Sequence, residues 1–264
     1  MAQILKKSLN INTLDLYLPL SNGSMTTGIN RLAKQGQKAW FCIQRYLLSC
    51  KHTNIRIWLE LFDILVKPII LYACEAWGDE THYSLKDASP IFKDPFEKLQ
   101  LKIHKQVLGV HRKTMNIPVL AELERFPLKL SIDTQMIKYF TRFYSMSKDR
   151  HMYKIYKESI KPTNINKNKW FSYIKRIADE NGLSNIWKNQ VDENSYNKST
   201  NNIANIFLQR LKDIYAQNAL RYIKKDENSN CGKMQFLRHL NTTCILKMTS
   251  IGNHYHKLDP AATD

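Results

Sequence analysis

Residues 61–78, LFDILVKPIILYACEAWG, form the longest apolar run of the chain and decide its fold. A helix through this run is apolar on most of its circumference, so other helices must pack around it. Pro68 has no backbone N–H, which predicts a kink near Lys67. A membrane span needs about 20 largely apolar residues, and charged residues such as Asp63 and Glu75 interrupt this run too often. The run therefore predicts a buried, kinked core helix.

The composition favours a helical, strongly basic protein. The chain has 264 residues, which is enough for one large domain or two small ones, and only 8 Gly and 8 Pro, which argues against a turn-rich β-sandwich. Its net charge of +17 favours a polyanionic partner, above all nucleic acid. A/T-rich coding would also enrich Lys, Asn, Ile and Tyr, so charge alone leaves both explanations open.

The cysteines indicate a reducing compartment. There are five, an odd number with no close pairing, namely Cys42, Cys50, Cys74, Cys231 and Cys244. No secretory signal is visible, so we expect an intracellular protein, cytoplasmic or nuclear. Cys74 lies among apolar residues beside Glu75 and is expected to be an inert thiol. His254 and His256 could be combined with Cys231 or Cys244, but the spacing is not that of a structural zinc site, and we expect no metal and no cofactor.

The N-terminal third begins with a different pattern. Leucines alternate with other residues at positions 14–20, which predicts a short strand. From Thr27 the spacing of apolar residues becomes helical and continues to about Ser49. Thr53 or Asn54 is a suitable cap for the helix that enters the apolar run.

The clearest local signature is Asp94-Pro95-Phe96-Glu97. Asp94 is a predicted N-cap, Pro95 suits the first helical position, and Glu97 would complete a capping box. Gly109 is the predicted helix stop. Lys98, Lys102 and Lys105 fall on one face of this helix, opposite its apolar face, and a basic loop follows at residues 111–115. Such a face could follow a phosphate backbone, or it could be an ordinary solvated helix face.

Later apolar patterns predict four more helical segments. They cover residues 118–125, 132–146, 170–180 with a stop at Asn181-Gly182, and 203–223. Polar, Asn-rich stretches at 159–169 and 192–202 are predicted linkers.

Several stretches, in order, resemble the reverse transcriptases of non-LTR (LINE-type) retrotransposons. The segment from Phe62 to Gly78, with Lys67-Pro68, Leu71-Tyr72, Glu75 and Trp77-Gly78, is similar to the segment that follows the polymerase palm in that family. The other similar segments are Tyr17-Leu18, Gly28-Ile29 with Lys38-Ala39-Trp40-Phe41, Glu97 through Val110, Glu122-Leu123 with Phe126-Pro127-Leu128, and Trp170 through Gly182 with Ile186-Trp187. The resemblance covers residues 14–225 and implies the thumb and the region after it.

The chain also departs from the family's pattern. The family holds two metal ions on palm carboxylates, including a paired aspartate motif, and this sequence contains no Asp-Asp dipeptide. Pro19 stands where the family has glycine, and Ala219 stands where tryptophan is expected. We therefore expect a truncated product that lacks the catalytic palm and is not an enzyme.

The expected organisation follows from the resemblance. The fold class is mainly α: a bundle-like helical thumb, a smaller helical region, and a short N-terminal β remnant. The expected limits are 1–26 for the remnant, 27–158 for the thumb, 159–169 for a linker, 170–225 for the post-thumb region and 226–264 for a poorly ordered end.

The resemblance also implies a role. The thumb of the family grips the template–primer duplex, so the expected partner is RNA or DNA, and no membrane or small-molecule substrate is expected. The implied phosphate contacts are Lys98, Lys102, Lys105, Arg112 and Lys113. Two alternatives stay open: a helical protein-interaction module, and a transposon remnant without function.

Overall fold

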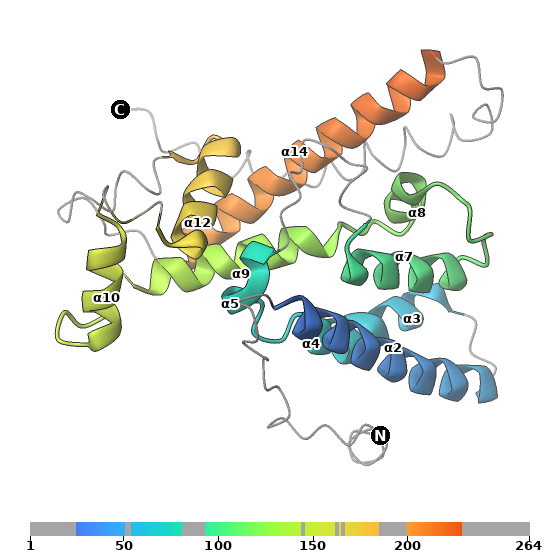
Figure 1. Cartoon of the computed structure of the whole chain (residues 1–264). Helices are drawn as coiled ribbons and strands as arrows, with labels where there is room; N and C mark the ends of the chain where they lie inside the picture. Colours follow the sequence, from blue (N-terminus) through green and yellow to red (C-terminus); the bar gives the residue numbers. More distant parts are fainter. Residues whose placement is uncertain are drawn as a thin grey trace. The chain divides into compact units, whose positions relative to one another are not determined.

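The computed structural model describes residues 25–50, 54–80, 93–143, 146–161, 164, 167–184 and 200–228 of the chain (Figure 1). Every regular element in these ranges is helical, which confirms the mainly α prediction for this part of the chain. The strand predicted at 14–20 lies outside the described residues, as do most of the second linker and residues 229–264. Within the described ranges, no helix is both long enough and apolar enough to traverse a bilayer.

The described residues form two units. Unit 1 consists of the described residues up to Ala73 together with residues 93–123, and unit 2 consists of residues 74–80 and those from Glu124 onward. The domain limits expected at 158 and 170 do not coincide with this division. The reason is packing: α12 (Lys169–Glu180) and α14 (Thr200–Asn228) both pack against α9 (Leu128–Arg142), which was expected to belong to the thumb.

Unit 1 is built on the long helix α2 (Thr26–Ser49). It packs against α7 (Pro95–Val107), against the one-turn π-helix η3 (Phe62–Val66) and against α4 (Lys67–Ile70). Trp40 of α2 is 1% exposed, and its ring lies 6.4 Å from that of Phe62. Gly36 allows the close approach of these helices, because a Cβ there would lie 3.0 Å from Ile70 Cγ1. The helices α3 (Ile55–Leu61) and α8 (Asn116–Glu122) complete the unit.

The apolar run that decides the fold is interrupted twice, which corrects the prediction of one kinked helix. The first interruption is η3, in which the Lys67 N–H donates to the carbonyl of Phe62, five residues earlier. Pro68 explains it, because its ring has no N–H and displaces the carbonyl four residues before it. The second is Ala73, whose φ of 52° is left-handed, after which α5 (Cys74–Trp77) begins in unit 2.

The predicted helix ends are confirmed where the signals are local. The Asn54 side chain caps α3 by accepting from Arg56 N at 2.9 Å. The Asp94 side chain caps α7 by accepting from Phe96 N at 2.8 Å. At Gly109 (φ 66°) the bonds Gly109 N to Gln106 O and Val110 N to Lys105 O form a Schellman motif. Gly182 ends α12 with the same pair of bonds.

In unit 2, α9 lies at the centre (Figure 1). Besides α12 and α14, the short helices α5 and η4 (Gly78–Glu80) pack against it. The indole N–H of Trp170 donates to the carbonyl of Glu75 at 2.7 Å, which ties α12 to α5. An aromatic cluster fills the space between α9, α10 (His151–Ser159) and α12; its members are Tyr139, Phe140, Phe143, Tyr156, Trp170 and Phe171. The helix α10 has one buried residue, Tyr156, and its sequence pattern did not predict it.

Candidate nucleic-acid interface

The structure places two of the five expected phosphate contacts on the outer face of α7. Lys98 and Lys102 are one helical turn apart and both exposed. The opposite face of α7 is buried through Phe96, Leu99 and Ile103, as the sequence predicted. Because these three side chains fix the rotation of α7, the two ammonium groups face solvent.

Lys105 has a different position from the other two lysines. Its ammonium donates to the carbonyl of Arg112 at 2.9 Å and to Asn116 Oδ1 at 2.8 Å. Partial burial lowers the pKa of Lys105. Its hydrogen bonds join the end of α7 to the following turn and to the first residue of α8. Lys105 therefore acts chiefly as a brace for the turn that carries Arg112 and Lys113.

Arg112 and Lys113 are exposed in that turn. The backbone N–H of Lys113 donates to His111 Nδ1 at 3.2 Å, and Thr114 N donates to the carbonyl of His111 at 2.9 Å. The turn is thus held by its own bonds and by Lys105, and it presents two cations beyond the C-terminal end of α7.

An aromatic ring of α2 also belongs to this face, and the sequence pattern did not reveal it. Phe41 is 44% exposed, and Lys102 Nζ lies over its ring at 5.7 Å from the centroid. The contact is a cation–π pair between two helices that pack together. A signal was present, since Phe41 falls on the polar side of α2, away from Trp40 and Ile43.

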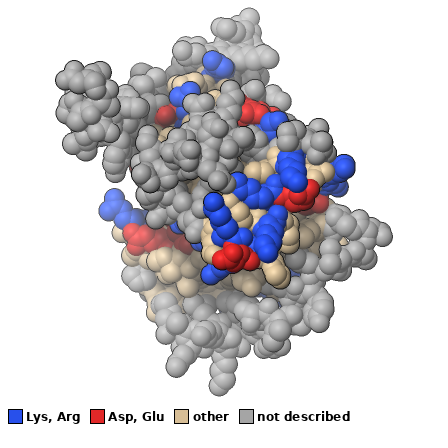
Figure 2. Space-filling model, turned by 90° about the vertical axis from the view of Figure 1, so that its left-hand side faces the viewer, with Lys and Arg blue, Asp and Glu red and all other residues tan. Residues whose placement is uncertain are grey.

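The two units differ in how their charges are arranged. The described residues of unit 1 hold twelve Lys or Arg and five Asp or Glu, of which Asp94 and Glu97 are buried. Those of unit 2 hold eighteen and twelve. Figure 2 shows the side on which α10 lies in Figure 1, where Lys and Arg side chains stand next to Asp and Glu side chains. Unit 1 therefore has the larger excess of exposed positive charge for its size.

Unit 2 has a buried ionic cluster that the sequence did not reveal. Lys129 and Asp133 of α9 are 3% and 2% exposed, and Lys129 Nζ lies 2.7 Å from Asp133 Oδ1. The Tyr173 hydroxyl of α12 donates to the same oxygen at 2.7 Å and also contacts Lys129 Nζ. Burial and the Asp133 carboxylate raise the pKa of Tyr173 well above its ordinary value. Every polar group of this triad has a partner within the triad, which is the arrangement of a structural cross-link.

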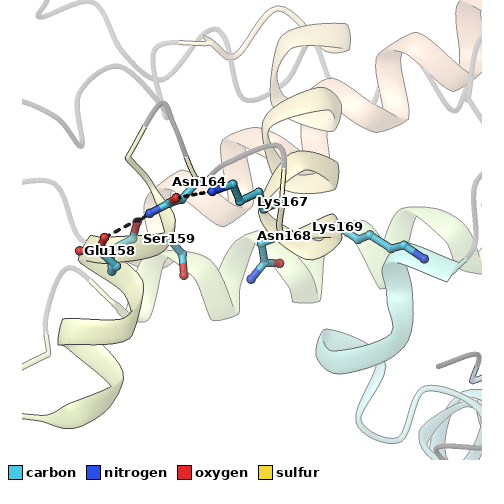
Figure 3. A pocket seen from close by; sticks show the side chains of 6 residues that line it. All are labelled: Glu158, Ser159, Asn164, Lys167, Asn168 and Lys169. Carbon is cyan, nitrogen blue, oxygen red and sulfur yellow. Dashed lines mark hydrogen bonds between the residues drawn. The ribbon is translucent and has the colours of Figure 1, made fainter.

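A polar pocket of about 420 Å³ lies at the start of α12 in unit 2 (Figure 3). Asn164 donates to both the backbone carbonyl and the carboxylate of Glu158, and Lys167 Nζ lies 3.5 Å from Asn164 Oδ1. The Asn168 side chain is occupied in capping α12, and the Lys169 side chain extends away from Glu158 in Figure 3. Glu158, Asn164 and Lys167 of this open pocket therefore bond to one another.

Two further expectations concern thiols and metals. Cys74 is 1% exposed, and burial, followed by the nearby Glu75 carboxylate, raises its pKa to about 12, which fits the expected inert thiol. Cys42, Cys50 and Cys74 all carry free thiols. In the part of the chain that the structure describes, no group of three or more His, Cys, Asp or Glu is placed to hold a metal ion. His254, His256, Cys231 and Cys244 lie outside the described residues.

Comparison with family models, curated proteins and solved structures found no match to this chain.

Proposed function

We propose that this chain is the thumb-side part of a reverse transcriptase of the non-LTR retrotransposon type, and that alone it binds the backbone of nucleic acid without reading sequence. The proposal combines the ordered resemblance of residues 14–225 with the helical structure of the described residues. The partner is an RNA or DNA duplex, held through its phosphates.

The observation that carries the proposal is the exposed basic face of unit 1. Lys98 and Lys102 project from a helix whose rotation is fixed by its buried side, and Arg112 and Lys113 extend the face beyond the helix end. Contacts of this kind release counterions and give binding that depends on salt but little on sequence. Lys105 supports this face by bracing the turn.

A mobility-shift titration tests the proposal. The full chain is titrated onto a 20-base-pair duplex of random sequence at 50 and 200 mM salt, and four phosphate contacts would lower the affinity by roughly two orders of magnitude across this range. The double variant Lys98→Gln/Lys102→Gln should reduce the slope of log K against log salt by about 2. The matched control is Lys154→Gln/Lys175→Gln, two exposed lysines of unit 2, which should leave the slope unchanged. An affinity that is the same at 50 and 200 mM salt, or the absence of binding at 50 mM salt, would contradict the proposal.

The proposal includes the lack of polymerase activity. Two-metal nucleotide transfer needs clustered carboxylates, and the sequence has no Asp-Asp pair of the kind that the family uses. A primer-extension assay with this chain as the only protein should show no incorporated nucleotide, and incorporation above a no-protein control would refute this part of the proposal.

A second function, a helical protein-interaction module, is favoured by one observation. In unit 1, Ile64 of η3 is 66% exposed, and Tyr72, in the turn after α4, is 48% exposed. Exposed apolar side chains this large often mark an association surface. Light scattering over a range of concentrations would favour this function if the chain self-associates, the variant Ile64→Ser/Tyr72→Ser does not, and nucleic-acid binding is absent.

A further inference from the structure

The outer face of α2 carries a row of cations that the resemblance did not assign. Lys34, Lys38 and Arg45 are exposed, and they lie on one side of the helix because they are four and seven residues apart. At 1.5 Å per residue the row is about 16 Å long. The sequence of α2 contains no Asp or Glu, so no carboxylate of the same helix neutralises the row.

The row is held in place by the packing of the other face of α2. Leu32, Trp40, Ile43 and Leu47 are 1–3% exposed and form part of the core of unit 1. The helix cannot rotate to bury its cations without exposing these four side chains. The basic face is therefore a fixed feature of the fold.

Phe41 connects this row to the basic face of α7. It lies on α2 between Lys38 and Arg45, one turn from each, and its ring is covered by Lys102 of α7. Phe41 thus lies between the cations of α2 and those of α7, and the two basic rows form one continuous surface. The combined face contains Lys34, Lys38, Arg45, Lys98 and Lys102 with Phe41 among them.

We propose that α2 supplies a second row of phosphate contacts, so that the nucleic-acid surface of this chain spans α2 and α7. This inference rests on the proposed function and enlarges its site by Lys34, Lys38 and Arg45. Charge complementarity identifies the occupant: cations along one helix face, with no carboxylate of the same helix between them, match a phosphate backbone.

An anionic membrane would match the same charge but not the same shape. An amphipathic helix binds a membrane by inserting its apolar face between the lipids. The apolar face of α2 is already buried in unit 1, and the large apolar or aromatic side chains that α2 exposes are limited to Phe41, Tyr46 and Leu48. Nucleic acid is therefore the occupant that the surface fits better.

The test compares three variants of the full chain in the salt-dependent titration with a 20-base-pair duplex. They are the α2 triple variant Lys34→Gln/Lys38→Gln/Arg45→Gln, the α7 double variant Lys98→Gln/Lys102→Gln, and a control triple in unit 2, Arg150→Gln/Lys154→Gln/Lys175→Gln, whose three residues are exposed. We expect the α2 triple to reduce the salt slope by about 2 to 3, at least as much as the α7 double, and the control to leave it unchanged. Circular dichroism should show the same helix content for all variants, because exposed Gln is a good helix former.

The outcomes separate the two proposals. If the α7 double reduces the slope and the α2 triple does not, the second row is wrong and the proposed function stands. If the unmodified chain does not bind the duplex at 50 mM salt, the proposed function and the second row both fall. If the α2 triple abolishes binding to vesicles of phosphatidylserine and phosphatidylcholine but leaves duplex binding unchanged, the face is a membrane surface and the inference is overturned.

Discussion

Units 1 and 2 differ in the surroundings of several of their lysines. In unit 1, Lys98 and Lys102 face solvent from a helix that buries its apolar side. In unit 2, Lys129 is 3% exposed and bonds to Asp133 and Tyr173, and Lys161 pairs with Glu158 at the surface. Lysine therefore serves internal structure at Lys129 of unit 2, whereas Lys98 and Lys102 of unit 1 remain exposed to a partner. The proposed partner surface is placed on unit 1, although the described part of unit 2 contains more lysines, because unit 1 has fewer Asp and Glu for each Lys or Arg.

The largest effect is expected from the buried triad of unit 2. Asp133→Ala would leave the Lys129 ammonium buried without its carboxylate, which typically costs about 3–5 kcal/mol of unfolding free energy. The matched control is Glu158→Gln, which breaks an exposed pair and should cost less than about 1 kcal/mol. Urea denaturation followed by circular dichroism measures both. Equal losses for the two variants would show that the triad does not stabilise unit 2.

A smaller effect is expected from two buried glycines, one in each unit. A Cβ at Gly78 of unit 2 would lie 2.4 Å from Met136 Sδ and 2.7 Å from Ile132 Cγ2, so Gly78→Ala should destabilise by about 1–3 kcal/mol. At Gly36 of unit 1 the nearest atoms are 3.0 and 3.3 Å away and belong to side chains, and the gain in helix propensity offsets the crowding. Gly36→Ala should therefore lie within about 1 kcal/mol of the parent in the same urea titration. A larger loss at Gly36 than at Gly78 would contradict these packing distances.

Several helix ends could be predicted from the sequence, because their causes lie within a few residues, whereas the helices predicted at 118–125 and 132–146 are found at Asn116–Glu122 and Leu128–Arg142. Asp94-Pro95 starts α7, and Gly109 and Gly182 end α7 and α12, each through local backbone bonds. The break at Ala73 could not be predicted, since a left-handed alanine has no local signal and depends on how its neighbours pack. The sequence pattern also did not predict α10, because this helix buries only one residue, Tyr156, and one apolar position gives no helical periodicity.

The candidate site was predictable in part, again for physical reasons. The spacing of Lys98 and Lys102 places them on one face of α7 whatever surrounds it. The bracing role of Lys105 depends on Arg112 and Asn116, which reach it only when the turn folds back. The Lys129–Asp133 pair has helical i, i+4 spacing, but only the packing of α12 shows that it is buried. The cationic row of α2 follows from the spacing of Lys34, Lys38 and Arg45, but only the packing of α2 against α7 shows that Lys102 extends it.

The buried Cys74 thiol of unit 2 should titrate well above its ordinary pKa. Because burial raises the pKa of Cys74 to about 12, the folded state keeps its proton when an unfolded chain, with a pKa near 9, would lose it. The contribution of the protonated Cys74 thiol to the free energy of unfolding is therefore fully present below pH 9. It is lost as the pH rises toward 12, by at most about 1.4 kcal/mol per pH unit. In the Cys74→Ala variant, the free energy of unfolding should decrease less between pH 9 and pH 12 than in the parent. At pH 8, mass spectrometry should find iodoacetamide on the exposed Cys50 long before Cys74; faster labelling of Cys74 would contradict its burial.

The smallest effect is expected from Lys105. Its ammonium already bonds to Arg112 O and Asn116 Oδ1, so Lys105→Gln should reduce the salt slope of duplex binding less than Lys102→Gln does. The loss of one phosphate contact lowers this slope by about 0.9, which sets the scale for Lys102→Gln. A reduction at Lys105 equal to that at Lys102 would mean that Lys105 contacts phosphate directly.

Lysine acetylation footprinting compares both units in one experiment. The full chain is treated briefly with an acetylating reagent, alone and with saturating 20-base-pair duplex, and each lysine is quantified by mass spectrometry. If unit 1 binds nucleic acid, the duplex will protect Lys98 and Lys102, while Lys154 and Lys175 of unit 2 will react at an unchanged rate. Protection of Lys154 and Lys175 with no change at Lys98 and Lys102 would contradict the assignment of the interface to unit 1.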